Sequence, residues 1–338
     1  MSKVKSWVAA KTGARLELQE LEAGPLGPDE VEVKVEYCGI CHSDFSVWKN
    51  EWGNAQYPAV LGHEAIGCVV AVGEHAKGLK IGQRVGVGWT AESCMHCERC
   101  LSGHQQLCAD SVPTIISHRG GFAETVRSHW AWAVPIPEGV DPASAGPLLC
   151  GGMTVFQPFL AYDIKPTSHV GVVGIGGLGH MALKFASTWG CEVTAFTSSP
   201  SKADEAKGFG ANKVVSSRNP KEIAAAAGTL DLLIVTVNVP LDWEALIATL
   251  GLKGRMHVVG VVPEPIPVAA FALITGQREI SGSPTGSPVD IATMLDFCAR
   301  HDIRPETELF PMSQVNEALK HLEDGNARYR IVLEADFN

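Results

Sequence analysis

The sequence lacks long apolar runs, blocks of basic residues and internal repeats. No apolar stretch reaches the ~18 to 20 residues that a membrane-spanning helix needs, and residues 1–5 carry no apolar core of a secretory signal peptide. The 27 Lys and Arg residues are outnumbered by 37 Asp and Glu residues, which gives a net charge of -10. This balance argues against nucleic acid and anionic membranes as partners, and we expect a cytoplasmic protein.

The remaining composition describes a globular chain large enough for two domains. Hydrophobic residues make up 46% of the 338 residues and charged residues 19%, and at roughly 150 residues per domain each domain can bury its own core. Ten cysteines, several of them clustered, are unusual for disulfide bonding in a cytoplasmic protein. The cysteines therefore favour bound metal over disulfides.

A buried strand, Val170 to Val173, runs into a glycine-rich turn that opens a predicted helix, Leu178 to Trp189. A second predicted strand, Glu192 to Phe196, follows. The spaced glycines match the dinucleotide fingerprint, in which they permit a tight turn, bring backbone close to a pyrophosphate and let the helix pack on the strand. An ordinary glycine-rich turn is the alternative. The order of elements favours a cofactor held by Gly174, Gly176, Gly177, Leu178 and Gly179.

The strongest local signal is a run of four closely spaced cysteines, Cys94-x2-Cys97-x2-Cys100-x7-Cys108. Four thiolates at loop spacing match a closed tetrahedral zinc site, which has no open position and does no chemistry. Metal binding would also stabilise a loop that has little core of its own. We therefore predict a structural zinc site, with disulfide bonding as the alternative.

A second metal site is predicted from Cys41, His63 and Cys150, although their wide spacing does not prove that they meet. Two thiolates and one neutral imidazole leave zinc uncharged, with a fourth position free for a substrate oxygen. Glu64 is expected beside the ligands or as a transient fourth ligand, and Asp44 is expected to orient His63. A buried, unreactive thiol is the alternative for Cys150.

Strands are predicted throughout the first part of the chain. Val31, Val33 and Val35 alternate with polar residues, which is typical of a strand with one buried face. Further short strands are predicted at Cys68 to Val72, Arg84 to Gly88 and Ala123 to Val126.

Later segments alternate strands and helices, as in a doubly wound parallel sheet. Strands at Leu230 to Val237 and Met256 to Val262 flank a predicted helix at Trp243 to Leu250. The C-terminal part is predicted to contain a helix at Ile291 to Arg300, a helix at Ser313 to Glu323 with a serine N-cap, and a strand at Tyr329 to Glu334 that returns to the first domain.

Taken together, the motifs resemble those of the zinc-containing medium-chain alcohol dehydrogenases. They are Cys38-Gly39-Ile40-Cys41-His42-Ser43-Asp44, Gly62-His63-Glu64, the four-cysteine run, Cys150-Gly151-Gly152-Met153-Thr154 and the glycine turn. Finer matches, such as Gly120-Gly121-Phe122-Ala123-Glu124 and Ala327-Arg328-Tyr329-Arg330, are most similar to the cinnamyl-alcohol-dehydrogenase-like branch, and within it to bacterial NADPH-dependent broad-range aldehyde reductases.

This resemblance implies an α/β protein with two domains and a cleft between them. A GroES-like, β-rich catalytic domain would span residues 1–151 and 285–338, and a doubly wound Rossmann cofactor domain residues 152–284. The catalytic domain would hold one catalytic and one structural zinc ion. Homologous enzymes commonly pair through the Rossmann domain, so we expect a homodimer. The apolar stretch Ile266 to Ile274 is expected to be core or dimer contact.

The resemblance also assigns roles to single residues. Cys41, His63 and Cys150 would bind the catalytic zinc, with Glu64 beside them, and Ser43 would carry the hydroxyl that moves a proton. His42 and Arg330 would contact the pyrophosphate of the cofactor, and Thr154 would contact its nicotinamide. Strand-end residues would contact the rest of the cofactor, with a plain loop position as the alternative for each: Thr236, Gly260 and Ser283. One departure is Ser46, which stands where many alcohol dehydrogenases end the proton relay with histidine.

The loop after the second Rossmann strand predicts the choice of nicotinamide. An NAD enzyme usually has an acid about twenty residues after the glycine turn, where it binds the ribose diol. Here the acid is absent, and Ser198, Ser199 and Lys202 can donate hydrogen bonds to a 2'-phosphate instead. A polar loop that merely starts a helix is the alternative. We predict a preference for NADP(H).

The function expected from these residues is reversible hydride transfer between NADPH and aliphatic or aromatic aldehydes, chiefly as reduction. Trp52 and Trp89 are candidates for the wall of the substrate pocket, although core packing would explain them as well. The alternatives are a narrow cinnamyl-alcohol-type enzyme, a polyol or amino-alcohol dehydrogenase, a zinc-free quinone reductase and a non-catalytic NADP(H)-binding regulator.

Overall fold

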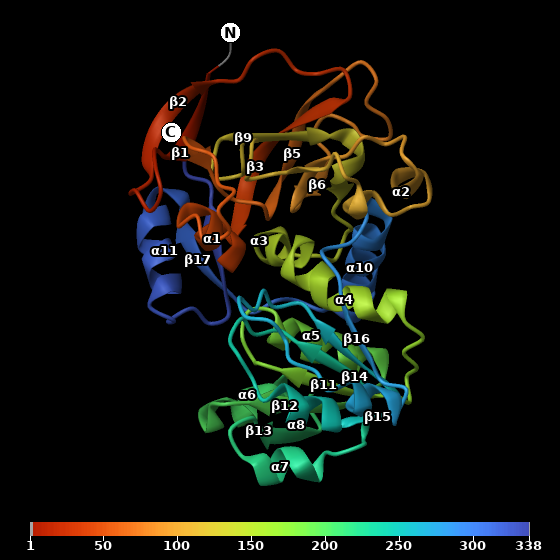
Figure 1. Cartoon of the computed structure of the whole chain (residues 1–338). Helices are drawn as coiled ribbons and strands as arrows, with labels where there is room; N and C mark the ends of the chain where they lie inside the picture. The colour runs from red at the N-terminus through yellow and green to blue at the C-terminus, as the bar shows by residue number, and fades with distance from the viewer. Residues whose placement is uncertain (1–2, 338) are drawn as a thin grey trace. The chain divides into compact units, whose positions relative to one another are not determined.

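The computed structural model describes residues 3–337 of the chain (Figure 1). It divides into two compact units. The first comprises Met1–Met153 and Thr285–Asn338, and the second Thr154–Pro284. The helix α4 (Gly151–Ala161) contains the boundary at residue 153.

The first unit is built around the long strand β3 (Glu30–Ile40). Its alternating valines, at positions 31, 33 and 35, are at most 3% exposed, which confirms the predicted one-sided burial. β3 lies in a seven-stranded sheet. Six of the strands follow the order β10-β6-β5-β3-β18-β17, and the seventh, β9, pairs with the N-terminal half of β3. The other strands are β5 (Ala65–Val72), β6 (Arg84–Val87), β9 (Thr125–His129), β10 (Ala133–Pro135), β17 (Thr307–Pro311) and β18 (Arg330–Glu334).

Smaller elements complete this unit. One sheet joins β2 (Glu17–Glu22), β1 (Lys3–Ala9) and β4 (Ala59–Val60), and another joins β7 (Thr90–Glu92) to β8 (Val112–Pro113). The helices are α1 (His42–Trp48), α2 (Glu98–Leu101), α3 (Pro142–Ala145), α10 (Pro288–His301) and α11 (Val315–Glu323). Short 3-10 turns lie at Gln105–Leu107, Trp130–Trp132, Gly146–Leu149 and Met312–Gln314.

The second unit is a doubly wound sheet of six parallel strands in the order β13-β12-β11-β14-β15-β16. The strands are β11 (His169–Val173), β12 (Glu192–Thr197), β13 (Lys213–Ser216), β14 (Leu230–Val235), β15 (Leu250–Val258) and β16 (Glu279–Gly282). The helices are α5 (Gly179–Trp189), α6 (Ala203–Gly208), α7 (Pro220–Ala225), α8 (Trp243–Ala248) and α9 (Ala270–Ile274), with a 3-10 turn at Pro200–Lys202.

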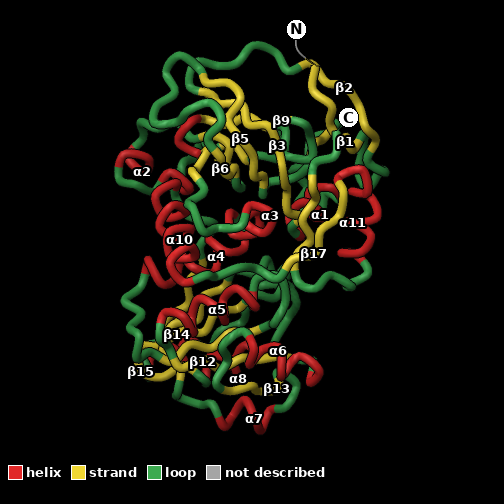
Figure 2. The backbone as a smooth tube through the Cα atoms, turned by 180° about the vertical axis from the view of Figure 1, so that it is seen from behind, coloured by secondary structure: helices red, strands yellow, loops and turns green. Residues whose placement is uncertain are grey.

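Helices cover both faces of this sheet. In Figures 1 and 2, α5 lies on the opposite side of the strands from α7 and α8. Burial on both faces explains the apolar run at residues 232–235 of the central strand β14, where four consecutive residues are buried. The predicted fold class, a β-rich unit and a doubly wound α/β unit, is confirmed.

Two local predictions were wrong. β15 begins at Leu250 and ends at Val258, whereas the sequence predicted a strand from Met256 to Val262. The strand contains Gly251, Gly254 and Lys253, whose backbone is left-handed. Two glycines so close together are typical of a loop, but here the strand continues through them with an irregular register against β14.

The second error concerns the start of the last helix. Ser313 does not cap α11, because it lies in the 3-10 turn before the helix and Gln314 occupies the N-cap position. The hydroxyl of Ser313 instead donates a hydrogen bond to Asp336. A tertiary partner thus replaced the local capping bond that the sequence pattern predicted.

None of the helices among residues 3–337 has the length and apolar content needed to cross a bilayer.

Candidate metal centres and cofactor-binding turn

The first candidate metal centre gathers residues from three separated segments of the first unit. Cys41 is the N-cap of α1 and follows β3 directly, and Cys150 immediately precedes α4. His63 and Glu64 lie in the short segment between β4 and β5. One ligand atom from each of these four residues lies within 4.8 Å of the other three. Folding therefore brings together all four residues that the sequence proposed for this site.

Sulfur and nitrogen atoms face each other at this centre. The Sγ atoms of Cys41 and Cys150 are 3.9 Å apart, and Nε2 of His63 lies 3.2 Å from the Cys150 Sγ. The three side chains are at most 8% exposed. The distances are far above the roughly 2.05 Å of a disulfide and near the separations of ligands that share one ion.

Asp44 holds this arrangement in place. One carboxylate oxygen, Oδ1, accepts hydrogen bonds from Nδ1 of His63 at 2.9 Å and from the backbone N–H of Gly62 at 2.8 Å. The other, Oδ2, accepts from the backbone N–H of Cys41 at 2.9 Å. The expected orientation of His63 by Asp44 is confirmed. Because Asp44 accepts from Nδ1, Nε2 is the nitrogen that faces Cys150 and that would face an ion.

The protonation of the two thiols fits a cation between them. The hydrogen bond with Cys150 lowers the pKa of Cys41 well below its usual value. The same bond, together with burial, raises the pKa of Cys150 well above its usual value. The protein alone thus stabilises one negative sulfur but not two, so a second thiolate requires a positive ion beside it.

Only one of the two carboxylate oxygens of Glu64 has a partner among the described residues. Glu64 is fully buried and its Oε1 is ion-paired with the guanidinium of Arg330, which is 5% exposed. Its Oε2 has no hydrogen-bond partner among the described residues. Burial raises the pKa of Glu64 to about 7, although Arg330 opposes the shift. A β-carbon at Gly39 would lie 2.0 Å from this Oε2, so only glycine leaves room for the carboxylate.

These groups fit a zinc ion. Two sulfurs, one oriented imidazole nitrogen and an unpartnered carboxylate oxygen are ligands that zinc takes, and all are positioned by buried hydrogen bonds. The sequence reasoning named each residue but missed the contact between Glu64 and Arg330, which lie 266 positions apart. No local pattern signals a pair so distant in the chain.

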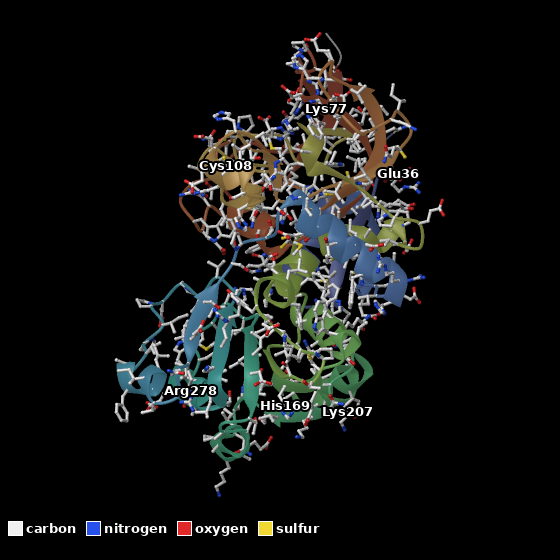
Figure 3. The ribbon with its side chains drawn as sticks, turned by 90° about the vertical axis from the view of Figure 1, so that its right-hand side faces the viewer. Glu36, Lys77, Cys108, His169, Lys207 and Arg278 are labelled. Carbon is white, nitrogen blue, oxygen red and sulfur yellow. The ribbon has the colours of Figure 1, made fainter. Side chains whose placement is uncertain are left out.

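The second candidate centre is the four-cysteine lobe, in which Cys108 is labelled in Figure 3. Sulfur–sulfur distances are 3.9 Å for Cys94 and Cys100, 3.9 Å for Cys97 and Cys108, and 3.5 Å for Cys94 and Cys108. A tetrahedral site with Zn–S bonds of about 2.3 Å would place its sulfurs ~3.8 Å apart.

The lobe also stabilises a negative charge on one of its sulfurs. Backbone N–H groups of His96 and Cys97 lower the pKa of Cys94 to about 6. All ten cysteines of the chain are free, so the disulfide alternative receives no support. His96 and His104 are exposed, as expected of solvated loop residues. The four thiols therefore fit a closed structural zinc site.

Aromatic rings line one side of the first centre. The ring of Trp89 packs edge-on against His63 at a centroid distance of 5.1 Å, and Trp52 packs edge-on against Trp89 at 6.1 Å. Both tryptophans are half-buried. The sequence proposed them as pocket residues but did not predict their contact with each other or with a metal-ligand candidate.

The hydroxyls of α1 differ in exposure. Ser43 is half-buried beside the exposed His42, whose ring stacks on Phe45 at 5.6 Å. Ser46 is buried, and its Oγ donates a hydrogen bond of 2.6 Å to Glu51. The position at which the family usually has histidine therefore carries a hydroxyl bound to a carboxylate.

The glycine turn of the second unit links β11 to α5. Gly174 has a φ of +88°, which only glycine adopts without strain. A β-carbon on Gly179 would lie 1.7 Å from the Gly174 carbonyl oxygen, whereas a β-carbon on Gly176 would meet nothing within 4 Å. The first glycine thus serves the turn, the last allows close packing, and the middle one leaves open space where a pyrophosphate could approach.

Other candidate cofactor residues are placed at or near this turn. Lys202 donates a hydrogen bond of 2.8 Å from Nζ to the Ile175 carbonyl, which ties the loop after β12 to the glycine turn. Ser198 is exposed and Ser199 half-buried in that loop. Thr236 lies against the carbonyls of Val173 and Gly174, at 2.9 and 3.0 Å.

Three further candidates make close contacts within the second unit or are buried in it. A β-carbon on Gly260 would lie 2.0 Å from the Val237 carbonyl oxygen, which explains the glycine there. Ser283 is bonded to Nε2 of the fully buried His257 at 3.0 Å, a partner that the sequence reasoning missed. Thr154 is buried in α4.

Comparison with known proteins identifies both units. Residues 27–138 match the family model of the alcohol dehydrogenase GroES-like domain, and residues 177–300 match that of the zinc-binding dehydrogenases. An aldehyde reductase of Synechocystis sp. is 50% identical over 335 residues, covering 99% of this chain and 100% of that protein.

Solved structures agree with this result. A cinnamyl alcohol dehydrogenase of Sorghum bicolor superposes with a TM-score of 0.94 at 40% identity, with 98% of each chain covered. CAD of Helicobacter pylori, solved in complex with NADP(H), superposes with a TM-score of 0.90 at 29% identity, again with 98% of each chain covered. The chain therefore belongs to the zinc-containing medium-chain alcohol dehydrogenase superfamily, in the branch of the cinnamyl alcohol dehydrogenases and bacterial aldehyde reductases.

Proposed function

We propose that this oxidoreductase transfers hydride between NADPH and aldehydes and works chiefly as an aldehyde reductase. The observation that carries the proposal is the buried set of Cys41, His63 and Cys150, with the unpartnered oxygen of Glu64 beside it. Residues 1–151 and 285–338 are proposed as the catalytic domain, and residues 152–284 as the cofactor domain. The aldehyde reductase of Synechocystis, at 50% identity, supports the same activity.

The side chains of this protein would orient the metal ligands, exclude water from the site and pass on a proton. When bound, zinc would polarise a carbonyl and the nicotinamide would supply the hydride. Asp44 fixes the imidazole of His63, and the rings of Trp52 and Trp89 form an apolar wall that keeps water away and accepts a nonpolar aldehyde. Ser43, two residues after Cys41 on α1, would pass a proton from solvent to the oxygen of the reduced substrate.

NADPH is proposed over NADH because no acid stands at the end of β12. Ser198 and Ser199 offer hydroxyls, and Lys202 is held beside the glycine turn by its bond to Ile175. The Helicobacter pylori relative was solved with NADP(H). The guanidinium of Arg330 has a buried Nε without a partner among the described residues, which supports its proposed contact with the cofactor pyrophosphate.

Replacing Ser198 by aspartate tests the cofactor proposal. A carboxylate there would repel a 2'-phosphate by several kcal/mol, so kcat/KM for NADPH should fall roughly 100-fold or more while that for NADH changes less than about threefold. The assay follows NADPH and NADH oxidation with a panel of aliphatic and aromatic aldehydes. Thr229→Asp is the matched control, because it adds the same charge before β14, at the opposite strand end of the sheet.

Three results would contradict these proposals. Equal losses with both cofactors would remove Ser198 from the cofactor site. Activity confined to aromatic aldehydes would favour the narrow cinnamyl-alcohol-type enzyme. An unmodified protein that binds NADPH but oxidises it with no aldehyde would favour a non-catalytic regulator.

We also propose that the chain forms a homodimer through the second unit. Phe271 and Ile274 of α9 are 75% and 69% exposed, which rules out a core role for them, and β16 is an unpaired edge of the described sheet. The double variant Phe271→Asp/Ile274→Asp should shift the mass in light scattering from twice 36.0 kDa to 36.0 kDa. Leu101→Asp, at a site 76% exposed in the first unit, should leave the mass unchanged. A monomeric unmodified protein would refute the proposal.

A further inference from the structure

A third group of metal-ligating side chains lies in the first unit, apart from both cysteine-containing centres. It consists of Glu30, Glu92 and His118, whose ligand atoms all lie within 4.8 Å of one another. Glu30 is the first residue of β3, Glu92 is the last residue of β7, and His118 lies in the segment between β8 and β9. All three are half-buried. None of them has a role in the proposed reaction.

The two carboxylates form no ion pair among the described residues. Neither Glu30 nor Glu92 forms an ion pair with a lysine, arginine or histidine among residues 3–337. Arg127 is paired with Glu32 at 2.8 Å and also donates to backbone carbonyls. Arg119 donates to the carbonyl of Glu22 at 3.2 Å. The nearby arginines thus make their hydrogen bonds elsewhere, and although Arg119 attracts Glu30 through space, no cation among the described residues contacts either carboxylate.

The third side chain is prepared as a ligand. Nδ1 of His118 lies 3.2 Å from the carbonyl oxygen of Arg119, and because a carbonyl only accepts, Nδ1 carries the proton. The lone pair of the neutral ring is then on Nε2, as in histidines whose second nitrogen is oriented for metal binding. His118 forms no hydrogen bond or ion pair with either carboxylate, so the group is not simply a histidine–glutamate pair.

The carboxylate of Glu30 is fixed as well. Its Oε2 accepts a hydrogen bond of 2.6 Å from the backbone N–H of Gly27. Glu30 and His118 also line a cavity of about 560 Å³, which gives room for waters to complete a coordination shell. The three side chains are therefore too far apart to bond directly, close enough to share one ion, and open to solvent on one side.

We propose that Glu30, Glu92 and His118 bind a third divalent cation of the Zn²⁺ or Mn²⁺ class. One imidazole nitrogen with carboxylate oxygens suits these ions, whereas Ca²⁺ and Mg²⁺ prefer oxygen ligands alone and copper(I) prefers sulfur. The ion would join three segments that are distant in sequence, and Glu92 lies two residues before Cys94 of the four-cysteine lobe. Its expected role is structural, stabilising the first unit.

Manganese titration of the zinc-loaded, full-length protein tests this site. Mn²⁺ is the probe because it has little affinity for thiolates and should leave both cysteine-containing centres undisturbed. Electron paramagnetic resonance of the free ion should show saturable binding of one Mn²⁺ per chain. Glu92→Gln, which keeps the side-chain shape, and His118→Asn, whose amide can still donate to the Arg119 carbonyl, should each weaken binding at least about tenfold.

His75→Ala is the matched control. His75 lies 3.7 Å from Asp29 and 3.5 Å from Glu74, but all three side chains are at least half exposed. This variant should bind Mn²⁺ like the unmodified protein. Unchanged circular dichroism and zinc content would show that Glu92→Gln and His118→Asn are folded, and if one variant does not fold, the other decides. Absence of saturable Mn²⁺ binding, or equal binding by folded variants, would overturn the proposal.

Discussion

Replacing Cys150 by alanine is expected to abolish turnover while leaving a folded protein. Its sulfur lies 3.9 Å from the Cys41 sulfur and 3.2 Å from Nε2 of His63, so the change removes one ligand from the centre. Loss of an ion that polarises the carbonyl should cost at least about 4 kcal/mol of transition-state stabilisation, or roughly 10³-fold in kcat/KM. The measurements are NADPH-dependent aldehyde reduction and zinc per chain, which should fall by one from about two.

Cys298→Ala provides the matched control for this result. Cys298 is a buried cysteine on α10 at 1% exposure, outside all three candidate metal groups. Its replacement should retain activity and zinc content, with at most a small loss of stability from the missing sulfur. If Cys150→Ala keeps near-normal turnover, Cys150 is a structural thiol and the proposed reaction centre is wrong.

Replacing Cys97 by alanine is expected to lower thermal stability far more than activity. The four sulfurs lie within 4.8 Å of one another, in a lobe whose helix α2 has only four residues. Such a lobe has little core of its own, so the bound ion contributes directly to folding. A loss of about 4 kcal/mol would lower the first unfolding transition by roughly 10 °C. Scanning calorimetry with and without added zinc measures the shift.

Cys68→Ala is the control for this second variant. Cys68 is a half-buried cysteine of β5 that belongs to no candidate metal group, and its loss should shift the transition by only a few degrees at most. The folded fraction of Cys97→Ala should retain most of its turnover at low temperature. The reverse pattern, with Cys97 needed for turnover and Cys150 for stability alone, would show that the two centres have been exchanged.

Sequence patterns predicted the structure correctly where the residues involved lie close together in the chain. The glycine turn links a strand and a helix that are adjacent in sequence, and each glycine has the steric role that the fingerprint requires. The spacing of Cys94, Cys97, Cys100 and Cys108 likewise places four sulfurs in one loop. Errors arose where long-range contacts override local propensity. β15 includes a glycine-rich segment that is flanked on both sides by residues paired with β14, and Ser313 bonds to Asp336 instead of capping α11.

The sequence by itself determined the four-cysteine run and the dinucleotide turn, because each depends on residues a few positions apart. The fold class followed from the alternation of strands and helices and from the family resemblance along the chain. The sequence named the members of the first centre but could not show that they meet. Tertiary structure decided that, and it also decided the contact of Glu64 with Arg330, the packing of Trp89 on His63, and the grouping of Glu30, Glu92 and His118. The physical reason is sheet register. Antiparallel pairing of β18 with β3 sets Ile331 opposite Ile40. The register of the two strands therefore decides which side chains lie beside Cys41, whatever their distance along the chain.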